Sequence, residues 1–359
     1  MKQIEICSLG SLSDGRLVTG YWLENDAGMR VLISDLGGTI WQLHAPDRDG
    51  NFADVVCGYD DPKALEASEG YIGALIGRFG NRIGGAAFEI DGKRYPLYAN
   101  NNANHLHGGK CGYDRRTWRV QTCEGDEPKL VLSLLSPDGE EGYPGTVNVT
   151  VTYTLRRDNA LVLQYHATTN KTTPINLTNH AYFNLGGYAS GNIFDHVLCL
   201  DVSDYLSTDE QLIPTGERVP VEGTPFDFRH PKRVGQDFTP DERCRDMQLA
   251  GGYDHCLNFS SGEATDGSVP LRGYLEHPAS GRRMELYTNQ PCVQFYSGNF
   301  LEDDGNLLKG GVVKHKQMAL CLETQKMPDS MHHENFTNVM LNPGEVYDYT
   351  TIYRFVTVE

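Results

Sequence analysis

The chain has 359 residues, of which 39% are hydrophobic, and its 31 Lys and Arg residues against 48 Asp and Glu residues give a formal net charge of −17. Such a negative field disfavours nucleic acid and anionic membranes as partners but is neutral toward an uncharged ligand. The nine cysteines contain no CxxC pair, which excludes a zinc ribbon or a thioredoxin-like motif. Scattered thiols, without an apolar leader or a stretch of membrane-spanning length, favour a cytoplasmic protein.

Strand signals recur along the whole chain. Asp-Gly pairs mark turns at positions such as 14–15, 91–92 and 138–139, and short runs rich in β-branched and aromatic residues lie between such turns. The strands expected most clearly are a hairpin at 86–97, two paired strands at 146–155 and 160–168, and a final strand at 346–358. The pattern predicts one all-β domain over residues 1–359, a large antiparallel β-sandwich.

Helix signals are few. Asp61-Pro62 precedes KALEA and predicts one short helix. Thr239-Pro240-Asp241-Glu242 has the pattern of a capping box with proline at the first helical position, which predicts a second helix beginning there. Both helices are expected to be short, so the predicted fold class stays all-β.

The segment NLTNHAYFNL, residues 176–185, carries the first candidate for chemistry. Read as a strand with period two, one of its faces presents Asn176, Thr178, His180, Tyr182 and Asn184. This face is polar but uncharged, whereas a strand face that meets bulk water usually carries charges. The pattern indicates a wall around His180 that binds a neutral polar ligand; a structural histidine within a sheet is the alternative.

A glycine-rich segment, GRFGNRIGG at 77–85, places Arg78 and Arg82 on either side of Asn81. Its glycine spacing is not that of a P-loop, and it lacks the terminal Lys-Ser or Lys-Thr. The two guanidinium groups could form a fork of donors for sugar hydroxyls or for a phosphate. A turn with solvated arginines is the alternative.

The segment NNNANHLHGGK at 100–110 holds His105 and His107, two residues apart as in an HxH metal site. A metal site needs a further carboxylate or histidine close by, but Lys110 and Cys111 stand at the expected spacing. We therefore expect no metal and interpret the histidines as hydrogen-bonding loop residues. A metal enzyme that uses both histidines is the alternative.

Near the C-terminus, ALCLETQKMPDS at 319–330 places Glu323 after small and apolar residues. By alternation, Glu323 shares a strand face with Cys321. A carboxylate leaving such a strand is partly desolvated, which raises its pKa and its basicity. A strand-end glutamate that faces solvent is the alternative.

Two further segments carry polar groups without a clear excess of charge. GGYDHCLNF at 251–259 places Asp254 after two glycines. QPCVQFYSGNF at 290–300 places Gln294 on a polar, uncharged strand face. The second segment fits a surface that binds a neutral polar ligand, although an ordinary amphipathic strand would explain it equally well.

Taken together, these segments resemble the aldose 1-epimerase (galactose mutarotase) family. The matching runs occur in the family's order and span roughly residues 30 to 355. They are GRFGNRI, HLHGG followed by Gly112, Asp114 and Trp118, SPDGEEGYPG (136–145), NLTNHAYFNL, GYDH, QPCVQFYSGNF and LETQKMPD. Departures from the pattern, such as Cys292 where glycine is common, touch neither the acid nor the base of the family.

The resemblance implies a β-sandwich of the kind called a supersandwich, with a monosaccharide bound in an open cleft. It implies interconversion of the α and β anomers of free hexoses such as galactose and glucose, without a cofactor, by a monomer or homodimer. His180 would be the general acid and Glu323 the general base. The residues that would hold the sugar are Asn81, Arg82, His107, Tyr182, Asp254 and Gln294.

The chemistry of ring opening fits these two side chains. A proton must leave the C1 hydroxyl and another must reach the ring oxygen, so an ionised carboxylate and a protonated imidazole are needed. Ordinary pKa values of about 4.3 and about 6.5 make both states reachable close to neutrality. Two alternatives remain: an epimerase of hexose 6-phosphates, with Arg78 and Arg82 as its basic pair, and a non-catalytic sugar-binding protein on the same fold.

Overall fold

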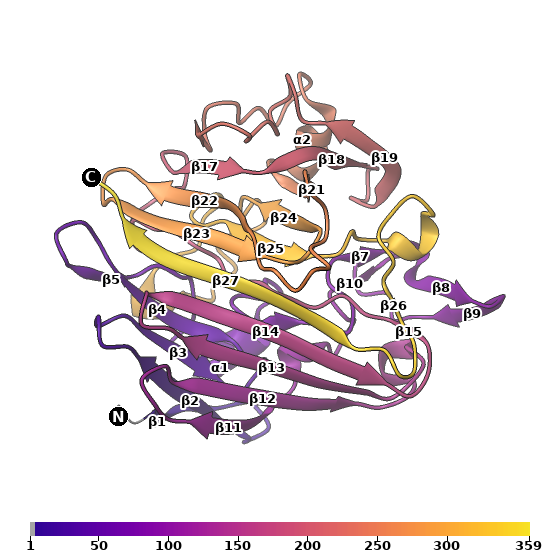
Figure 1. Cartoon of the computed structure of the whole chain (residues 1–359), viewed down its shortest axis with the longest axis horizontal. Coiled ribbons are helices and arrows are strands. Elements are labelled where there is room, and N and C mark those ends of the chain that lie inside the picture. The colour runs from indigo at the N-terminus through magenta and orange to yellow at the C-terminus, as the bar shows by residue number, and fades with distance from the viewer. Residues whose placement is uncertain (1–3) are drawn as a thin grey trace.

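The computed structural model describes residues 4–359, and strands dominate it (Figure 1). Nine antiparallel strands form the largest sheet, which runs across the whole view. Their order across the sheet is β11 (Arg119–Cys123), β12 (Lys129–Ser136), β13 (Val147–Leu155), β14 (Ala160–Thr169), β27 (Tyr347–Thr357), β23 (Arg282–Thr288), β22 (Leu271–His277), β17 (Val197–Leu200) and β20 (Lys232–Arg233).

Two five-stranded sheets complete the sandwich. The first consists of β1 (Glu5–Ser11), β2 (Leu17–Glu24), β3 (Arg30–Ser34), β4 (Ile40–Pro46) and β5 (Phe52–Asp54), in chain order. The second has the order β19 (Pro214–Pro220), β18 (Val202–Thr208), β21 (Asp254–Phe259), β24 (Cys292–Tyr296) and β25 (Cys321–Gln325). The second sheet carries Asp254, Tyr296 and Glu323, which line the cavity described below.

Short elements fill the connections. Four two-stranded ladders pair β6 (Leu75–Ile76) with β16 (Thr178–Asn179), β7 (Arg82–Ile83) with β10 (His105–Leu106), β8 (Ala87–Ile90) with β9 (Lys93–Pro96), and β15 (Thr173–Pro174) with β26 (Met340–Leu341). The α-helices in the described part of the chain are α1 (Pro62–Ala67) and α2 (Arg245–Ala250). None of the described helices is long and apolar enough to cross a membrane.

The core lies between the large sheet and the two smaller ones. Along β13 the side chains of Val147, Val149 and Val151 are buried and alternate with more exposed neighbours. They belong to one apolar cluster with Val31 of β3 and Leu322 of β25. The period-two pattern of the sequence therefore becomes the inner face of a sandwich, because successive side chains of a strand point to opposite sides.

The structure confirms the predicted fold class and the predicted strands. The hairpin at 86–97 is β8 and β9, the paired strands are β13 and β14, and the final strand is β27. The first predicted helix is α1, where the Asp61 carboxylate accepts a hydrogen bond from the Lys63 N–H and Pro62 opens the first turn.

The predicted start of the second helix is wrong, because α2 begins at Arg245 rather than near Thr239. The Asp241 carboxylate accepts hydrogen bonds from the backbone and the guanidinium of Arg243, which stabilises a local turn instead. The Thr239 hydroxyl donates to the carbonyl of Asp237 and so caps no helix. Such local side-chain bonds compete with helix formation.

Candidate active site

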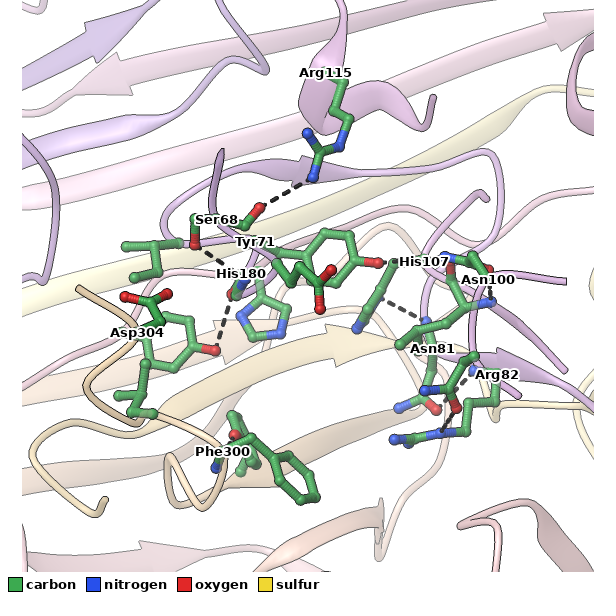
Figure 2. A pocket seen from close by; sticks show the side chains of 18 of the residues that line it. Ser68, Tyr71, Asn81, Arg82, Asn100, His107, Arg115, His180, Phe300 and Asp304 are labelled. Atoms are coloured by element: carbon green, nitrogen blue, oxygen red, sulfur yellow. Dashed lines mark hydrogen bonds between the residues drawn. The ribbon is translucent and has the colours of Figure 1, made fainter. Parts of the chain in front are cut away.

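An open cavity of about 1150 Å³ is lined by residues of β21, β24 and β25 and by segments far apart from them in the chain. Figure 2 shows His180 in the middle of this cavity, with Asn81 and Arg82 at one end and Asp304 at the other. Seven of the eight predicted site residues line it, namely Asn81, Arg82, His107, His180, Tyr182, Asp254 and Glu323. The cavity is therefore the candidate active site.

Strand register brings three of the predicted site residues, Asp254, Gln294 and Glu323, onto neighbouring strands. In the ladder of β24 with β25, Glu323 lies opposite Gln294, and in the ladder of β21 with β24, Asp254 lies opposite Tyr296. Gln294 is the one predicted site residue that the cavity lining does not include. Its Nε2 donates to Asp254 Oδ1 at 2.7 Å, so Gln294 holds the carboxylate that faces the cavity.

The segment around His180 is held by main-chain bonds more than by a regular strand. The His180 N–H donates to the Ala74 carbonyl, and the Gly73 N–H donates to the His180 carbonyl, both at 2.9 Å. Of the predicted polar face, His180 and Tyr182 line the cavity, whereas the Asn176 and Asn184 side chains bond to main-chain groups. An uncharged polar face can thus also arise from buried amides that satisfy the backbone.

The predicted acid and base lie side by side. His180 Nε2 is 3.7 Å from Glu323 Oε1, and the two side chains are 5% and 2% exposed. Glu323 Oε2 is buried and finds no hydrogen-bond partner within residues 4–359. Such an unsatisfied carboxylate oxygen is costly in a folded protein and is typical of a site that awaits a ligand.

Burial shifts the pKa values of this pair in opposite directions. It lowers the pKa of His180 to about 4 and raises the pKa of Glu323 well above its usual range, where the nearby Asp254 charge adds to the effect. The raised basicity of Glu323 was expected from its apolar strand. The ordinary pKa of about 6.5 that the sequence argument used for His180 does not hold, because the imidazole is almost fully removed from water.

Hydrogen bonding and burial fix the tautomer of His107. Its backbone is left-handed, with φ of 50°, and its Nδ1 accepts a hydrogen bond from the Asn81 N–H at 3.1 Å. Burial lowers the pKa of His107 well below its usual range, so the ring is neutral and its one proton lies on Nε2. His107 therefore presents a hydrogen-bond donor, which suits a sugar oxygen.

The same tautomer of His107 opposes the binding of a metal ion. Ligand atoms of His107, His180 and Glu323 lie within 4.8 Å of one another, as in a site with two histidines and one carboxylate. A metal at His107 Nε2 would move the ring proton to Nδ1, where it would meet the Asn81 N–H donor. His105 does not help, because its Nδ1 bonds to the Tyr98 carbonyl and its Nε2 to the Tyr143 hydroxyl.

The two arginines of the glycine-rich segment have different roles. Arg82 lines the cavity, and its Nη1 lies 3.8 Å from Asp254 Oδ2. Arg78 is 2% exposed, and its guanidinium donates to the Pro144 and Gly145 carbonyls and to the Ser136 hydroxyl. Both interpretations of Arg78, a ligand donor and a solvated turn residue, are therefore wrong; it holds the SPDGEEGYPG segment in place.

Tyr71 also lines the cavity, although no sequence pattern predicted it. Its ring centre lies 4.6 Å from that of His107 and 6.0 Å from that of His180, so it packs against both imidazoles (Figure 2). Its φ of 54° is unusual for a bulky residue and indicates backbone strain that the surroundings maintain. No local pattern marks this residue, because its position depends on contacts between distant segments.

A β-sandwich with a buried carboxylate beside an imidazole, in a cavity of hydrogen-bonding groups, defines a class of acid–base enzymes that act on polar ligands. Residues 20–354 match the family model described as aldose 1-epimerase. A galactose mutarotase from Homo sapiens is 44% identical over 344 residues, covering 96% of this chain and 95% of that protein.

An aldose 1-epimerase from Escherichia coli strain K12 is 34% identical over 343 residues, covering 95% of each chain. A solved aldose epimerase homologue from C. elegans has a TM-score of 0.85 and 28% identity, covering 95% of this chain and all of that one. The chain therefore belongs to the aldose 1-epimerase family, and it is an enzyme of that class, a mutarotase.

Proposed function

We propose that this enzyme interconverts the α and β anomers of free aldohexoses such as galactose and glucose, with Glu323 as general base and His180 as general acid. The observation that carries these roles is the pair itself, with Nε2 and Oε1 3.7 Å apart in the cavity. In the reaction, the Glu323 carboxylate takes the proton of the C1 hydroxyl while His180 Nε2 gives a proton to the ring oxygen. The ring C1–O bond breaks, and an open-chain aldehyde forms.

After rotation about C1–C2, the same protons move back. His180 removes the proton from the open-chain hydroxyl as that oxygen attacks the carbonyl, and Glu323 returns a proton to the carbonyl oxygen. The ring closes on the other face with no net change in either residue. Each positioned proton transfer is typically worth about 10²- to 10⁴-fold in rate.

Burial of the pair favours this sequence of steps. The reactive form of the pair is charged, and it arises when the one proton that the pair holds moves from Glu323 to His180 Nε2. After ring opening both members are neutral, because each proton transfer removes one charge. Two unit charges about 4 Å apart attract by about 4 kcal/mol at an effective dielectric constant of 20. The lowered pKa of His180, from 6.5 to about 4, corresponds to a burial penalty of roughly 3 kcal/mol. The His180 penalty alone offsets most of this attraction, and burial of the Glu323 carboxylate adds a further cost, so the charged pair is the less populated, reactive form.

Hydrogen-bonding groups around the pair suit a neutral sugar. We propose that Asn81, Arg82, His107 and Asp254 contact its oxygens and that the Tyr182 ring packs beside His180, whose ring centre lies 5.0 Å away. Gln294 would act by holding Asp254. The one-domain organisation of residues 1–359, the monomeric or dimeric state and the cytoplasmic location stay predictions.

A hexose 6-phosphate is a weaker candidate substrate. Of the two arginines expected to bind the phosphate, only Arg82 is available. The Arg78 guanidinium already donates to main-chain carbonyls and a hydroxyl. At the far end of the cavity, Lys314 lies 2.6 Å from the Asp304 carboxylate, which neutralises it. A phosphate there would have to displace an existing ion pair.

Polarimetry tests the proposed roles directly. Freshly dissolved α-galactose should relax faster with the wild type than in buffer, and Glu323→Gln and His180→Asn should each lose most of that acceleration. His166→Asn is a matched control, because this histidine lies exposed on β14, away from the cavity. Full activity in both site variants would overturn the assignment, and comparison with glucose 6-phosphate separates the two substrate classes.

A further inference from the structure

One strand contacts both nitrogens of the His180 ring. Cys321 and Glu323 are two residues apart on β25, so their side chains point to the same side. Glu323 Oε1 lies 3.7 Å from Nε2, and Cys321 Sγ lies 3.4 Å from Nδ1. Cys321 is fully buried within an apolar cluster. The imidazole is thus bracketed by a carboxylate on its reactive side and a thiol on the other.

The acid–base cycle restricts what Nδ1 can do. When His180 gives its Nε2 proton to the ring oxygen, the proton left on the imidazole is the one on Nδ1. A neutral ring with the opposite tautomer would carry its proton on Nε2 and could not take one back from the sugar. The nitrogen beside Cys321 must therefore stay protonated throughout, and it needs an acceptor.

We propose that Cys321 is a positioning residue whose sulfur accepts a hydrogen bond from His180 Nδ1–H and so keeps Nε2 as the nitrogen that exchanges the catalytic proton. This inference rests on the proposed role of His180. Burial raises the pKa of the Cys321 thiol well above its usual range, so the sulfur stays neutral. A neutral thiol is a weak acceptor as well as a weak donor.

A neutral acceptor has a chemical consequence that a carboxylate would not have. A carboxylate at Nδ1 would stabilise the imidazolium and make His180 a weaker acid. The groups that face the ring are Cys321 and Glu323 from β25, Tyr296 from β24, Tyr182, Tyr71 and the neutral His107. Glu323 is the only carboxylate among them. Cys321 therefore orients the ring without adding a charge. Burial and Glu323 set the acid strength of His180.

Kinetics of three variants test this role. With α-galactose, Cys321→Ala should lower kcat by about 3- to 10-fold, the rate equivalent of losing one ordinary hydrogen bond, and leave KM nearly unchanged. Cys321→Ser keeps an acceptor and should restore most of kcat. Cys321→Asp should move the acidic limb of the pH–rate profile to higher pH, because the added carboxylate favours the imidazolium.

Cys57→Ala is the matched control. Cys57 is a buried thiol in the same apolar cluster, so its removal creates a similar void. A purely structural role for Cys321 predicts equal effects of the two alanine variants and no rescue by serine, and that result would overturn the proposal.

Nitrogen NMR of histidine-labelled protein gives a second test that needs no activity. The chain has 12 histidines, so the His180 signals are assigned by their loss in His180→Asn. At neutral pH, wild-type His180 should be the Nδ1–H tautomer, and Cys321→Ala should show a mixture of tautomers. An Nε2–H tautomer in the wild type would refute the inference. A wild type that accelerates no anomer exchange would instead refute the proposed function.

Discussion

Glu323→Gln is the most informative single change, because it keeps the shape of the side chain and removes only its charge and basicity. The loss of a positioned general base should lower kcat by about 10²- to 10⁴-fold, which is about 3–5 kcal/mol in the activation barrier. His180 would also lose the carboxylate 3.7 Å from its Nε2, so the imidazolium needed for the first step would become scarcer.

The same change should not destabilise the fold. Burial raises the pKa of Glu323 in the folded state, so ionisation of this carboxyl opposes folding. The penalty is absent at low pH, where the carboxyl is protonated in both states, and it grows as pH rises above the range in which a free glutamate titrates. Glutamine carries no such penalty, and therefore Glu323→Gln should melt at or above the wild-type temperature at pH 8 and lose that advantage near pH 4.

Two assays on the same preparations separate these effects. Polarimetry with α-galactose gives kcat and KM, and thermal unfolding followed by circular dichroism gives the melting temperature at each pH. A variant that is inactive and at least as stable as the wild type supports the reasoning. A variant that keeps wild-type kcat, or that is inactive because it melts well below the wild type, refutes it.

Three further outcomes follow from the site. Because burial lowers the pKa of His180 to about 4, kcat/KM should stay level through pH 6.5 and fall only toward pH 4, when the pair with Glu323 takes up a second proton; a midpoint near 6.5 would contradict this. Gln294→Ala removes the donor 2.7 Å from Asp254 and should raise KM roughly tenfold with a smaller change in kcat, measured by initial rates. Prolonged chelation followed by desalting should leave activity unchanged, since the tautomer of His107 opposes metal binding. A loss of activity that added Zn²⁺ restores would contradict this prediction.

Patterns within one segment were predicted well from the sequence. The alternation in 146–155 and 160–168 became paired strands, and the apolar run before Glu323 became a buried strand that raises its pKa. The roles of His180 and Glu323 came from the family resemblance, and the structure brings both side chains into one cavity. Spacing alone could not have shown that they meet, because 142 positions separate them.

The sequence predictions that were wrong or missing concern contacts between segments. Arg78 looks like Arg82 in the sequence, yet it is buried, and its guanidinium donates to the carbonyls of a distant loop. Tyr71 packs against His107 and His180, which come from segments distant from it in the chain. Thr239 resembles a helix cap, but its hydroxyl finds a nearer carbonyl. Local patterns do not encode such partners, since burial and hydrogen bonding at these positions are set by tertiary structure.

A crystal structure of the enzyme with bound galactose would examine the proposed proton path most directly. We expect the Glu323 carboxylate within hydrogen-bond distance of the C1 hydroxyl and His180 Nε2 within hydrogen-bond distance of the ring oxygen. A sugar bound with its C1 end toward Asp304 and Lys314, out of reach of both residues, would contradict the proposed mechanism.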